Sequence, residues 1–440
     1  MALPDLPAAL AACAGRPEAA TALARSAAVA GLGTDGGPFK SFIRVADDPA
    51  AASGRRSDAL LGCLFSVKDN IDEAGITTTC GSKVLADAPP AARDAAVVAA
   101  LKAAGAISLG KNNMHEFALG ISGANALFGS TVNPWDRGRT CGGSSGGSAS
   151  AVALRQVHLS LGTDSGGSVR MPASFTGIAG FKPTFGAIPL AGVAGAAWSI
   201  DSVGFFTATA ADQRRVWSAL RPDDVPAPRS RPPRLAYLAD DSMGRVEPVV
   251  WAHYQATLDR LRAAGVSLTG LSMAGFELAP YLCIATVYPE VTSSHLELLR
   301  TKSALYDQPI RGLICLGEAW SQRTYVDAQR LRSVLRARFA ALIRPFDAVL
   351  MPTVPVQPPR SGQPVRVTGD PDAGLFTIIR FTVLGNVIGY PAISIPAGLD
   401  GDGLPSGLQV MGRPHEDAAL LETAGALETI LGPTPPPPSA

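Results

Sequence analysis

The chain has 440 residues, of which 47% are hydrophobic, and its formal net charge is only +1. Such a chain can bury a large core, as one big domain or two closely packed ones. The even balance of charges argues against nucleic acid or an anionic membrane as a partner and favours a small molecule.

The cysteines and histidines limit the kinds of site that the chain can form. The six cysteines form no C-x-x-C pair, and the five histidines show no metal-ligand spacing. Reduced thiols and no metal site are therefore expected. The N-terminus lacks a basic segment followed by an unbroken apolar one, and the later apolar run at 383–399 is broken by Asn386, Gly389 and Pro391. Without a signal peptide or membrane span, the cytoplasm is the expected location.

The first third of the chain alternates between predicted helices and strands. Residues 1–35 are alanine-rich and predict surface helices, and the apolar run 60–67 predicts a buried strand that ends at Lys68. Asp94 is expected to cap a helix through Ala104, and 106–110 is expected to be the next strand. This rhythm indicates an α/β sheet.

Two glycine-serine loops follow, at 142–148 and 162–170. Residues 147–154 predict a helix after the first loop, and 156–161 predict a strand that enters the second. Loops joined this tightly to strands and helices are not typical linkers.

The second half is expected to be mainly helical between 211 and 345 and to cover one side of the sheet. Amphipathic helices are predicted at 247–264 and 319–343, after a Pro-rich crossing at 222–233. The arginines of the second helix are interpreted as a solvated stripe.

The end of the chain returns to the sheet. Strands are predicted at 348–352 and 392–396, followed by a last helix near 415–431. The Pro-rich tail 433–440 is expected to be disordered or extended.

The two loops and Lys68 suggest a serine hydrolase. Each loop places a serine, Ser144 or Ser168, among glycines that let backbone N–H groups converge on an oxyanion. A hydroxyl needs a base to become a nucleophile, and no histidine stands in a strand-end motif with an acid partner. Lys68 ends an apolar strand, where burial would lower its pKa enough for it to act as that base.

These motifs resemble the amidase signature family. The family's fingerprint is V-K-D, then G-G-S-S-G-G-S, then G-T-D-x-G-G-S-[IV]-R-x-P, and this sequence carries it at 67–69, 142–148 and 162–172. The likeness extends over roughly 60–430, with further segments at 111–118, 132–136, 180–186, 199–204 and 407–414.

The resemblance implies a Ser-cisSer-Lys triad in an α/β/α fold with a mixed central sheet. Ser168 would be the nucleophile, Ser144 the bridging serine with a cis peptide bond, and Lys68 the base. The resemblance also implies further roles: backbone N–H groups of Ser165, Gly166, Gly167 and Ser168 as the oxyanion hole, Ser145, Asp164 and Arg170 as supports of the triad, and Ala118, Leu119 and Gly120 as part of the acyl pocket.

Other interpretations compete with this one. The sequence G-G-S-S-G also fits the nucleophile elbow of α/β-hydrolases, which would make Ser144 the nucleophile with His295 or His415 as base. S-L-G-K at 108–111 matches S-x-x-K of penicillin-binding enzymes by chance, since K-T-G is absent, and neither loop continues into a P-loop G-K-[ST]. The family also includes the A subunit of the tRNA-dependent amidotransferase, which passes ammonia from glutamine to a partner. A non-enzymatic protein that kept the fold is a third interpretation, against which the intact triad argues.

The sequence therefore predicts a single amidase signature domain over 1–432, with its core at 60–210 and 346–432. The predicted function is hydrolysis of a small amide through an acyl-enzyme on Ser168, with no cofactor, and the alternative is the glutaminase component of the amidotransferase. The partner expected is a small amide substrate, and whether the chain forms a homodimer is left open. The region near Tyr288 and Arg380 is expected to shape the substrate pockets, where Arg380 either recognises a carboxylate or forms a structural ion pair.

Overall fold

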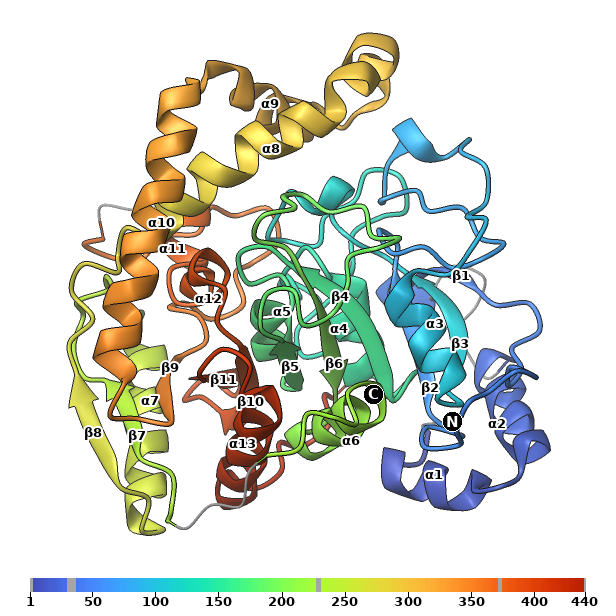
Figure 1. Cartoon of the computed structure of the whole chain (residues 1–440), viewed down its shortest axis with the longest axis horizontal. Coiled ribbons are helices and arrows are strands. Elements are labelled where there is room, and N and C mark those ends of the chain that lie inside the picture. The colour runs from blue at the N-terminus through green and yellow to red at the C-terminus, as the bar shows by residue number, and fades with distance from the viewer. Residues whose placement is uncertain (1–2, 30–36, 227–230, 371–373, 439–440) are drawn as a thin grey trace.

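The computed structural model describes residues 3–29, 37–226, 231–370 and 374–438, and within these ranges its central feature is a mixed sheet of 11 strands (Figure 1). The order across the sheet is β1-β3-β2-β4-β6-β5-β10-β11-β9-β7-β8. The strands are β1 (Phe42–Val45), β2 (Leu64–Lys68), β3 (Ile107–Asn112), β4 (Leu159–Asp164), β5 (Ala179–Lys182), β6 (Ser202–Thr207), β7 (Leu235–Leu238), β8 (Leu268–Leu271), β9 (Ala348–Pro352), β10 (Ala392–Leu399) and β11 (Pro405–Met411).

The pairing joins two halves of the chain. The N-terminal half supplies β1 to β6, in which β2 runs parallel to β3 and β4, and the C-terminal half supplies β7 to β11. The halves meet where β5 pairs antiparallel with β10, with Phe181 opposite Ile393. One continuous sheet therefore spans both halves.

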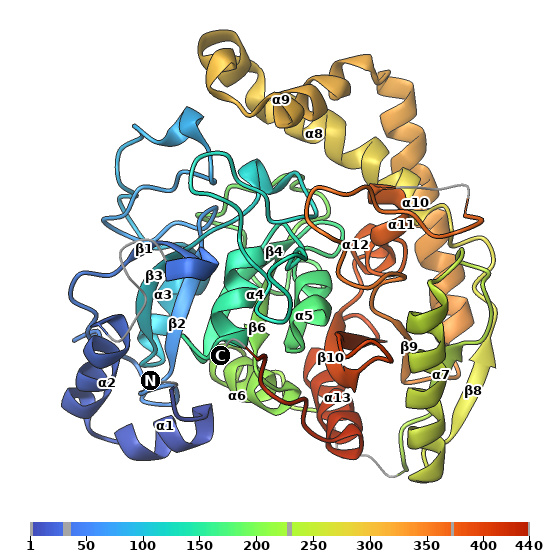
Figure 2. The same ribbon diagram turned by 180° about the vertical axis from the view of Figure 1, so that it is seen from behind.

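Helices cover both faces of this sheet (Figures 1 and 2). They are α1 (Leu6–Cys13), α2 (Pro17–Val29), α3 (Ala96–Ala103), α4 (Gly146–Ala153), α5 (Arg170–Thr176), α6 (Ala210–Leu220), α7 (Pro248–Ala263), α8 (Ala279–Lys302), α9 (Gln308–Cys315), α10 (Gln322–Ile343), α11 (Leu375–Ile378), α12 (Val383–Ile388) and α13 (Asp417–Leu431). α8 and α9 project beyond one end of the sheet in both views. The architecture is the predicted α/β/α arrangement.

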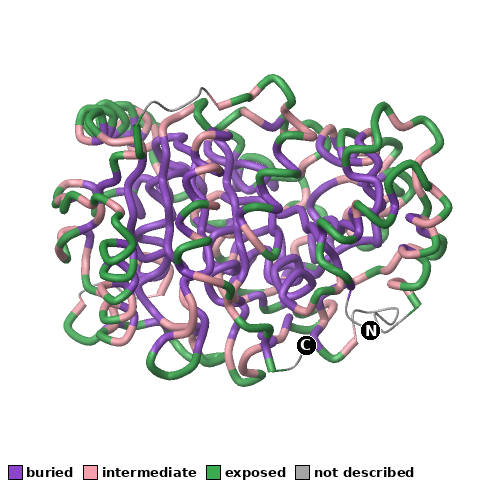
Figure 3. The backbone as a smooth tube through the Cα atoms, turned by 90° about the horizontal axis from the view of Figure 1, so that it is seen from below, coloured by how far each residue is buried: buried purple, intermediate pink, exposed green. Residues whose placement is uncertain are grey.

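Alternating side chains explain why both faces are covered. In β2, Phe65 and Val67 join a core cluster with α3, α6, α7 and α13, whereas Leu64 joins a different cluster with α4. Successive residues of a strand point to opposite faces, so an apolar strand with no polar face needs a helix layer on each side. Lys68 lies four residues after Leu64 in the same strand, so its side chain points to the same face of the sheet, toward α4. Figure 3 shows the buried backbone in the middle of the molecule and the exposed backbone at its periphery.

The first half corrects several predicted boundaries. β2 begins at Leu64, because 60–63 forms turns rather than strand. Asp94 does not cap α3, whose N-cap is Ala95; its carboxylate instead accepts from the Ala74 amide and from Lys102.

The region 211–345 differs from the expected helical cover. It adds β7 and β8 to the edge of the sheet, next to β9, as well as its helices. Both strands have four residues, and β8 is partly exposed, so neither gives the long apolar run that predicts a buried strand. Part of the Pro-rich crossing, 227–230, lies outside the described residues. Among the residues that are described, no helix is both long enough and apolar enough to span a membrane.

Candidate active site

Lys68 lies at the centre of a buried polar cluster at the end of β2. Its side chain is fully buried, and its Nζ lies 2.7 Å from Ser144 Oγ and 2.8 Å from Thr163 Oγ1. Burial lowers the pKa of Lys68 to about 7, although the negative charges of Asp201 and Asp164 raise it in part. The amine is thus poised to gain or lose a proton near neutral pH.

Ser144 is held by the glycine-serine loop that precedes α4. The peptide bond between Gly143 and Ser144 is cis, and the Ser144 side chain is fully buried. The loop has no room for larger residues, because a Cβ on Gly143 would lie 2.9 Å from the carbonyl oxygen of Gly120. The carbonyl of Ser144 accepts a hydrogen bond from the His115 amide. The loop therefore holds Ser144 Oγ where it accepts a hydrogen bond from Lys68 Nζ.

Ser168 lies in the loop between β4 and α5, half-buried in the wall of a cavity of about 220 Å³. Gly167, which precedes it, has φ +127°, a backbone conformation that residues other than glycine rarely adopt. A Cβ at this position would also approach Thr382 Oγ1 to 2.2 Å. Only glycine fits at position 167. The turn that it makes places Ser168 in the lining of the cavity.

A buried ion pair braces this loop from behind. Asp164 and Arg170 are both fully buried, and Arg170 Nη2 lies 2.8 Å from Asp164 Oδ1. The guanidinium also donates to the Asn386 side chain, and Asn386 Nδ2 donates to Asp164. Although burial raises the pKa of Asp164, the charge and hydrogen bonds of Arg170 outweigh it and hold that pKa at about 2. Asp164 and Arg170, for which the resemblance implied a supporting role, thus hold this loop, and Ser145, the third such residue, donates from Oγ to the carbonyl of Thr163 at 3.3 Å.

The predicted oxyanion hole needs one correction. The amide of Gly167 donates to Asp164 Oδ1 at 2.8 Å, and the amide of Val169 donates to Oδ2 at 3.1 Å. The Gly167 amide is therefore committed to the brace and is not available to a substrate. Within the described part of the chain, the amides of Gly166 and Ser168 have no protein acceptor. Gly166 and Ser168, with Ser165 next to them, remain the candidates for binding an oxyanion.

The cavity in front of Ser168 has walls from both halves of the chain. The predicted pocket residues Ala118, Leu119 and Gly120 lie in its lining. The other wall comes from α8, α9, α11 and the residue after α11, which contribute Cys283, Ile284, Val287, Tyr288, Leu313, Leu375 and Ile379. Tyr288 is thus in the pocket, as the sequence analysis expected.

Several residues at the site were quoted within motifs without being assigned a role. Thr163 is the second partner of Lys68, and Asp201 is a buried carboxyl in the segment before β6 that accepts a hydrogen bond from the Ala197 amide. Burial raises the pKa of Asp201 to about 6. Membership in the motifs at 162–172 and 199–204 was the available signal for both. Cys283 and Asn386 lie in no quoted motif, and only the fold brings them here.

Other candidate residues have partners elsewhere. Arg380 pairs with Asp370 at 2.6 Å, and both side chains are buried, which favours the structural ion pair over carboxylate recognition. His295 contacts the Tyr306 hydroxyl. The amide of His415 donates to Thr184. The structure gives neither histidine a contact with Ser144, so it offers no support for the elbow interpretation.

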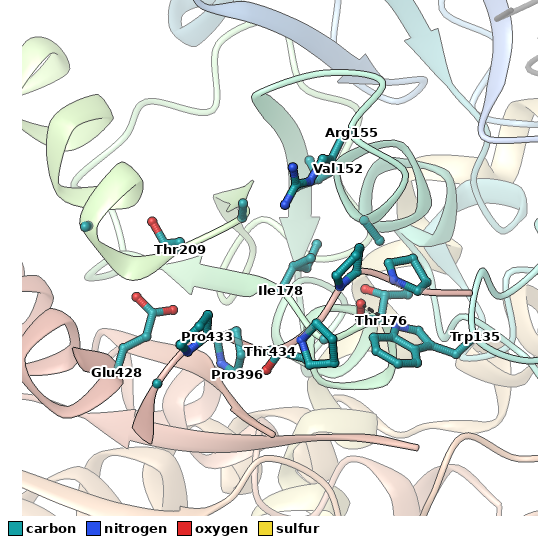
Figure 4. A pocket seen from close by; sticks show the side chains of 18 of the residues that line it. Trp135, Val152, Arg155, Thr176, Ile178, Thr209, Pro396, Glu428, Pro433 and Thr434 are labelled. Atoms are coloured by element: carbon teal, nitrogen blue, oxygen red, sulfur yellow. Dashed lines mark hydrogen bonds between the residues drawn. The ribbon is translucent and has the colours of Figure 1, made fainter. Parts of the chain in front are cut away.

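A larger cavity, of about 460 Å³, lies under the C-terminal segment (Figure 4). Figure 4 shows Trp135, Thr176, Pro396 and Glu428 around it, and residues 433–437 of the tail themselves form part of its lining. The tail, which was expected to be disordered or extended, is described to Pro438, and Pro437 is buried. This cavity shares no lining residue with the one at Ser168. We therefore place the candidate active site at Ser168.

Comparison with known proteins agrees with the fold and the cluster. The Amidase family model matches residues 40–421. The glutamyl-tRNA(Gln) amidotransferase A subunit of Anaeromyxobacter sp. (strain K) is 36% identical, over 94% of this chain and 93% of the relative. A crystal structure described as an amidase superposes with a TM-score of 0.87 at 31% identity, covering 98% of this chain and 100% of the other. The glutamyl-tRNA(Gln) amidotransferase A subunit of Thermotoga maritima superposes with a TM-score of 0.82 at 27% identity, covering 99% and 98% of the two chains.

A mixed sheet with helices on both faces, carrying a buried lysine at the end of β2 in contact with a buried serine, defines the class of enzymes that act on amide C–N bonds with the amidase signature fold. The match to the family model covers most of the chain. This protein belongs to the amidase signature family.

Proposed function

We propose that the chain hydrolyses an amide through an acyl-enzyme on Ser168, with Ser144 and Lys68 as its proton relay. The observation that carries the proposal is the 2.7 Å contact between Lys68 Nζ and Ser144 Oγ, both fully buried, together with the place of Ser168 in the lining of a cavity. Because burial lowers the pKa of Lys68 to about 7, a large fraction of the amine has a free electron pair at neutral pH.

The relay balances protons over both half-reactions. Lys68 takes the proton of Ser144 while Ser144 takes that of Ser168, so the Ser168 oxygen can attack the amide carbon. The same proton returns through Ser144 to the leaving nitrogen, because an amine anion leaves poorly. Water then attacks the ester with the relay as base, which releases the carboxylic acid and restores Ser168.

The negative oxygen of each tetrahedral intermediate needs donors that are already in place. The amides of Gly166 and Ser168 supply them, because the Asp164–Arg170 pair fixes the loop before substrate arrives. The carboxylate of Asp164 thus acts through the loop and does not touch the substrate.

Two settings for this reaction have support. The names of the relatives support a glutaminase component that supplies ammonia to partner proteins in a tRNA-dependent amidotransferase, and they do so more directly than they support a free-standing amidase. That setting would also involve tRNA, which the balanced charge of this chain did not suggest. The superposition on a structure described as an amidase supports a chain that acts alone.

The first experiment measures ammonia release by the purified chain on a panel of aliphatic, aryl and urea-like amides and glutamine. Ser168→Ala should lose about 10⁴-fold in kcat, as removal of a core triad member does. Ser148→Ala is the matched control, because the Ser148 hydroxyl donates to the carbonyl of Leu161 and lies outside the relay. Near-native turnover by Ser168→Ala would overturn the assignment. Activity that appears only when amidotransferase partners are added would favour the amidotransferase setting.

A further inference from the structure

The cavity beside Ser168 has an uncharged lining. Among the described residues that form its wall, the polar side chains are Ser165, Ser168, Cys283 and Tyr288, and all others are apolar or glycine. Burial raises the pKa of the Tyr288 phenol above its usual range, which keeps it neutral at physiological pH. A substrate group that enters this space therefore finds no cation or anion to pair with.

Three charged side chains on or near the elements that form this wall are held by other groups. Arg332 donates to the carbonyls of Val387 and Ser199. Glu290, two residues beyond Tyr288, accepts from Ser199 and Tyr325. Arg380 is paired with Asp370. These partners fix the charges outside the cavity, so none of them can turn toward a substrate without leaving a buried charge unpaired.

Glutamine carries two charges beyond its amide. Its α-ammonium and α-carboxylate would find no charged partner in the lining of the cavity, and burying an unpaired charge is costly. An apolar acyl group gains free energy from the same transfer.

The volume of the cavity sets the size of the acyl group. A cavity of about 150 Å³ lined by apolar side chains accommodates benzene. The space of about 220 Å³ beside Ser168 is therefore large enough for one six-membered ring or a chain of about five or six carbons.

Cys283, a wall residue on α8, contacts the loop that carries Ser168. Its thiol donates to the carbonyl of Ser165 at 3.7 Å, and a Cβ on Gly166 would lie 3.7 Å from Cys283 Sγ. Burial raises the pKa of Cys283 to about 12, so the thiol stays protonated and acts as a small apolar surface.

We propose that the acyl site of this enzyme accepts uncharged, apolar carboxamides of about the size of benzamide or hexanamide and discriminates against glutamine, with Cys283 limiting the depth of the site. The proposal rests on the reaction at Ser168 proposed above. Because the lining of the cavity is uncharged, the proposal favours an amidase that acts alone over a glutaminase component of an amidotransferase.

The test compares kcat/KM of the purified full-length chain for benzamide, hexanamide, acetamide and glutamine. The apolar amides should exceed glutamine by at least 100-fold. Cys283→Phe fills the cavity and should lower kcat/KM for benzamide by at least tenfold more than for acetamide. Cys315→Phe is the matched control, because this cysteine is exposed at the end of α9. A preference for glutamine, or an equal loss on every amide in Cys283→Phe, would overturn the proposal.

A binding measurement separates this proposal from the reaction itself. Calorimetric titration of Ser168→Ala with benzamide and with glutamine reports the preference of the cavity without turnover. Tighter binding of benzamide, lost in Ser168→Ala/Cys283→Phe, is the expected result, and equal or tighter binding of glutamine would contradict it. If Ser168→Ala still hydrolysed hexanamide, the proposed reaction at Ser168 would be wrong. The binding preference would still be decided by the titrations alone.

Discussion

Lys68 is the residue whose environment decides the chemistry. Its side chain lies in the core and contacts two hydroxyls, and no carboxylate lies within ion-pair distance of Nζ among the described residues. The charge of Asp201, although not in contact, still raises the pKa of Lys68. Lysine can serve as a base here because desolvation outweighs that charge.

The pH dependence of the reaction follows from this balance. In the proposed relay the neutral amine of Lys68 is the active form, so kcat/KM should rise with pH through an apparent pKa near 7. Asp201→Asn removes a charge that raises the pKa of Lys68, and the midpoint should therefore move to lower pH. A pH profile on one neutral amide measures both.

Asp417→Asn provides the control for that experiment. Asp417 is also a buried carboxyl, but it accepts from Thr184 and lies near Lys182 rather than Lys68. Its replacement should leave the midpoint in place. A profile of Asp201→Asn that coincides with the wild type would contradict the coupling between Asp201 and Lys68.

Gly167 is the second residue with a sharp expectation. Gly167→Ala places a Cβ against Thr382 and forces a side chain into a positive φ, so the loop must shift. The expected result is a loss of at least 100-fold in kcat, since a misplacement of about 1 Å at the reacting atoms can cost about that much. Gly186 also has a positive φ, but a Cβ added there would meet open space. Gly186→Ala is therefore the control. It should lower stability slightly and leave kcat nearly unchanged, and a loss of kcat as large as that of Gly167→Ala would refute the argument.

At the scale of elements, the cavity depends on how α8 packs against the turn that follows α9. The 3₁₀ turn Leu316–Ala319 lies against α8, where Thr292 donates to the carbonyls of Tyr288 and Ile314. Because Tyr288 and Leu313 line the cavity, this contact fixes the relative position of two of its walls.

Two glycines in this segment should respond in opposite ways to alanine. A Cβ on Gly317 would lie 2.0 Å from Thr292 Oγ1 and 2.4 Å from the carbonyl oxygen of Tyr288, so Gly317→Ala should destabilise the protein by about 1–3 kcal/mol. A Cβ on Gly312, in the interior of α9, meets nothing within 4 Å, and Gly312→Ala should stabilise by about 0.5–1 kcal/mol. Chemical denaturation of both variants tests the pair, and a stable Gly317→Ala would show that α8 and this turn do not pack as described.

At the scale of the whole molecule, the site depends on both halves of the chain. Lys68, Ser144 and Ser168 come from the N-terminal half, whereas Asn386, Gln409 and Thr382, which bond to the Asp164–Arg170 brace or to Gly166, come from the C-terminal half. The β5–β10 pairing brings the two sets together.

Asn386 tests that dependence. Asn386→Ala should lower kcat by roughly 10- to 100-fold with a smaller change in KM, because the loop is less firmly held while the cavity is unchanged. Asn386→Asp should lose more, since it places a second carboxyl where Nδ2 now lies 2.9 Å from Asp164 Oδ1. Kinetics together with thermal unfolding separate a positional effect from loss of folded protein. Unchanged kcat in both variants would mean that the brace does not depend on the second half.

The sequence by itself determined the parts of this protein that are local in the chain. The three motifs identify the family, and each of Lys68, Ser144 and Ser168 stands in one of these short patterns. The period of apolar residues predicted the strands at 348–352 and 392–396, which are buried on both faces.

Only the tertiary structure decided what depends on distant contacts. It showed that the Gly167 amide is taken by Asp164, and that Asn386 braces the loop from 222 residues away. It also showed that β7 and β8 extend the sheet, because strands this short gain stability from their neighbours rather than from their own pattern. The uncharged cavity is assembled from α8, α9, α11 and the segment 118–121, which no local pattern relates to one another.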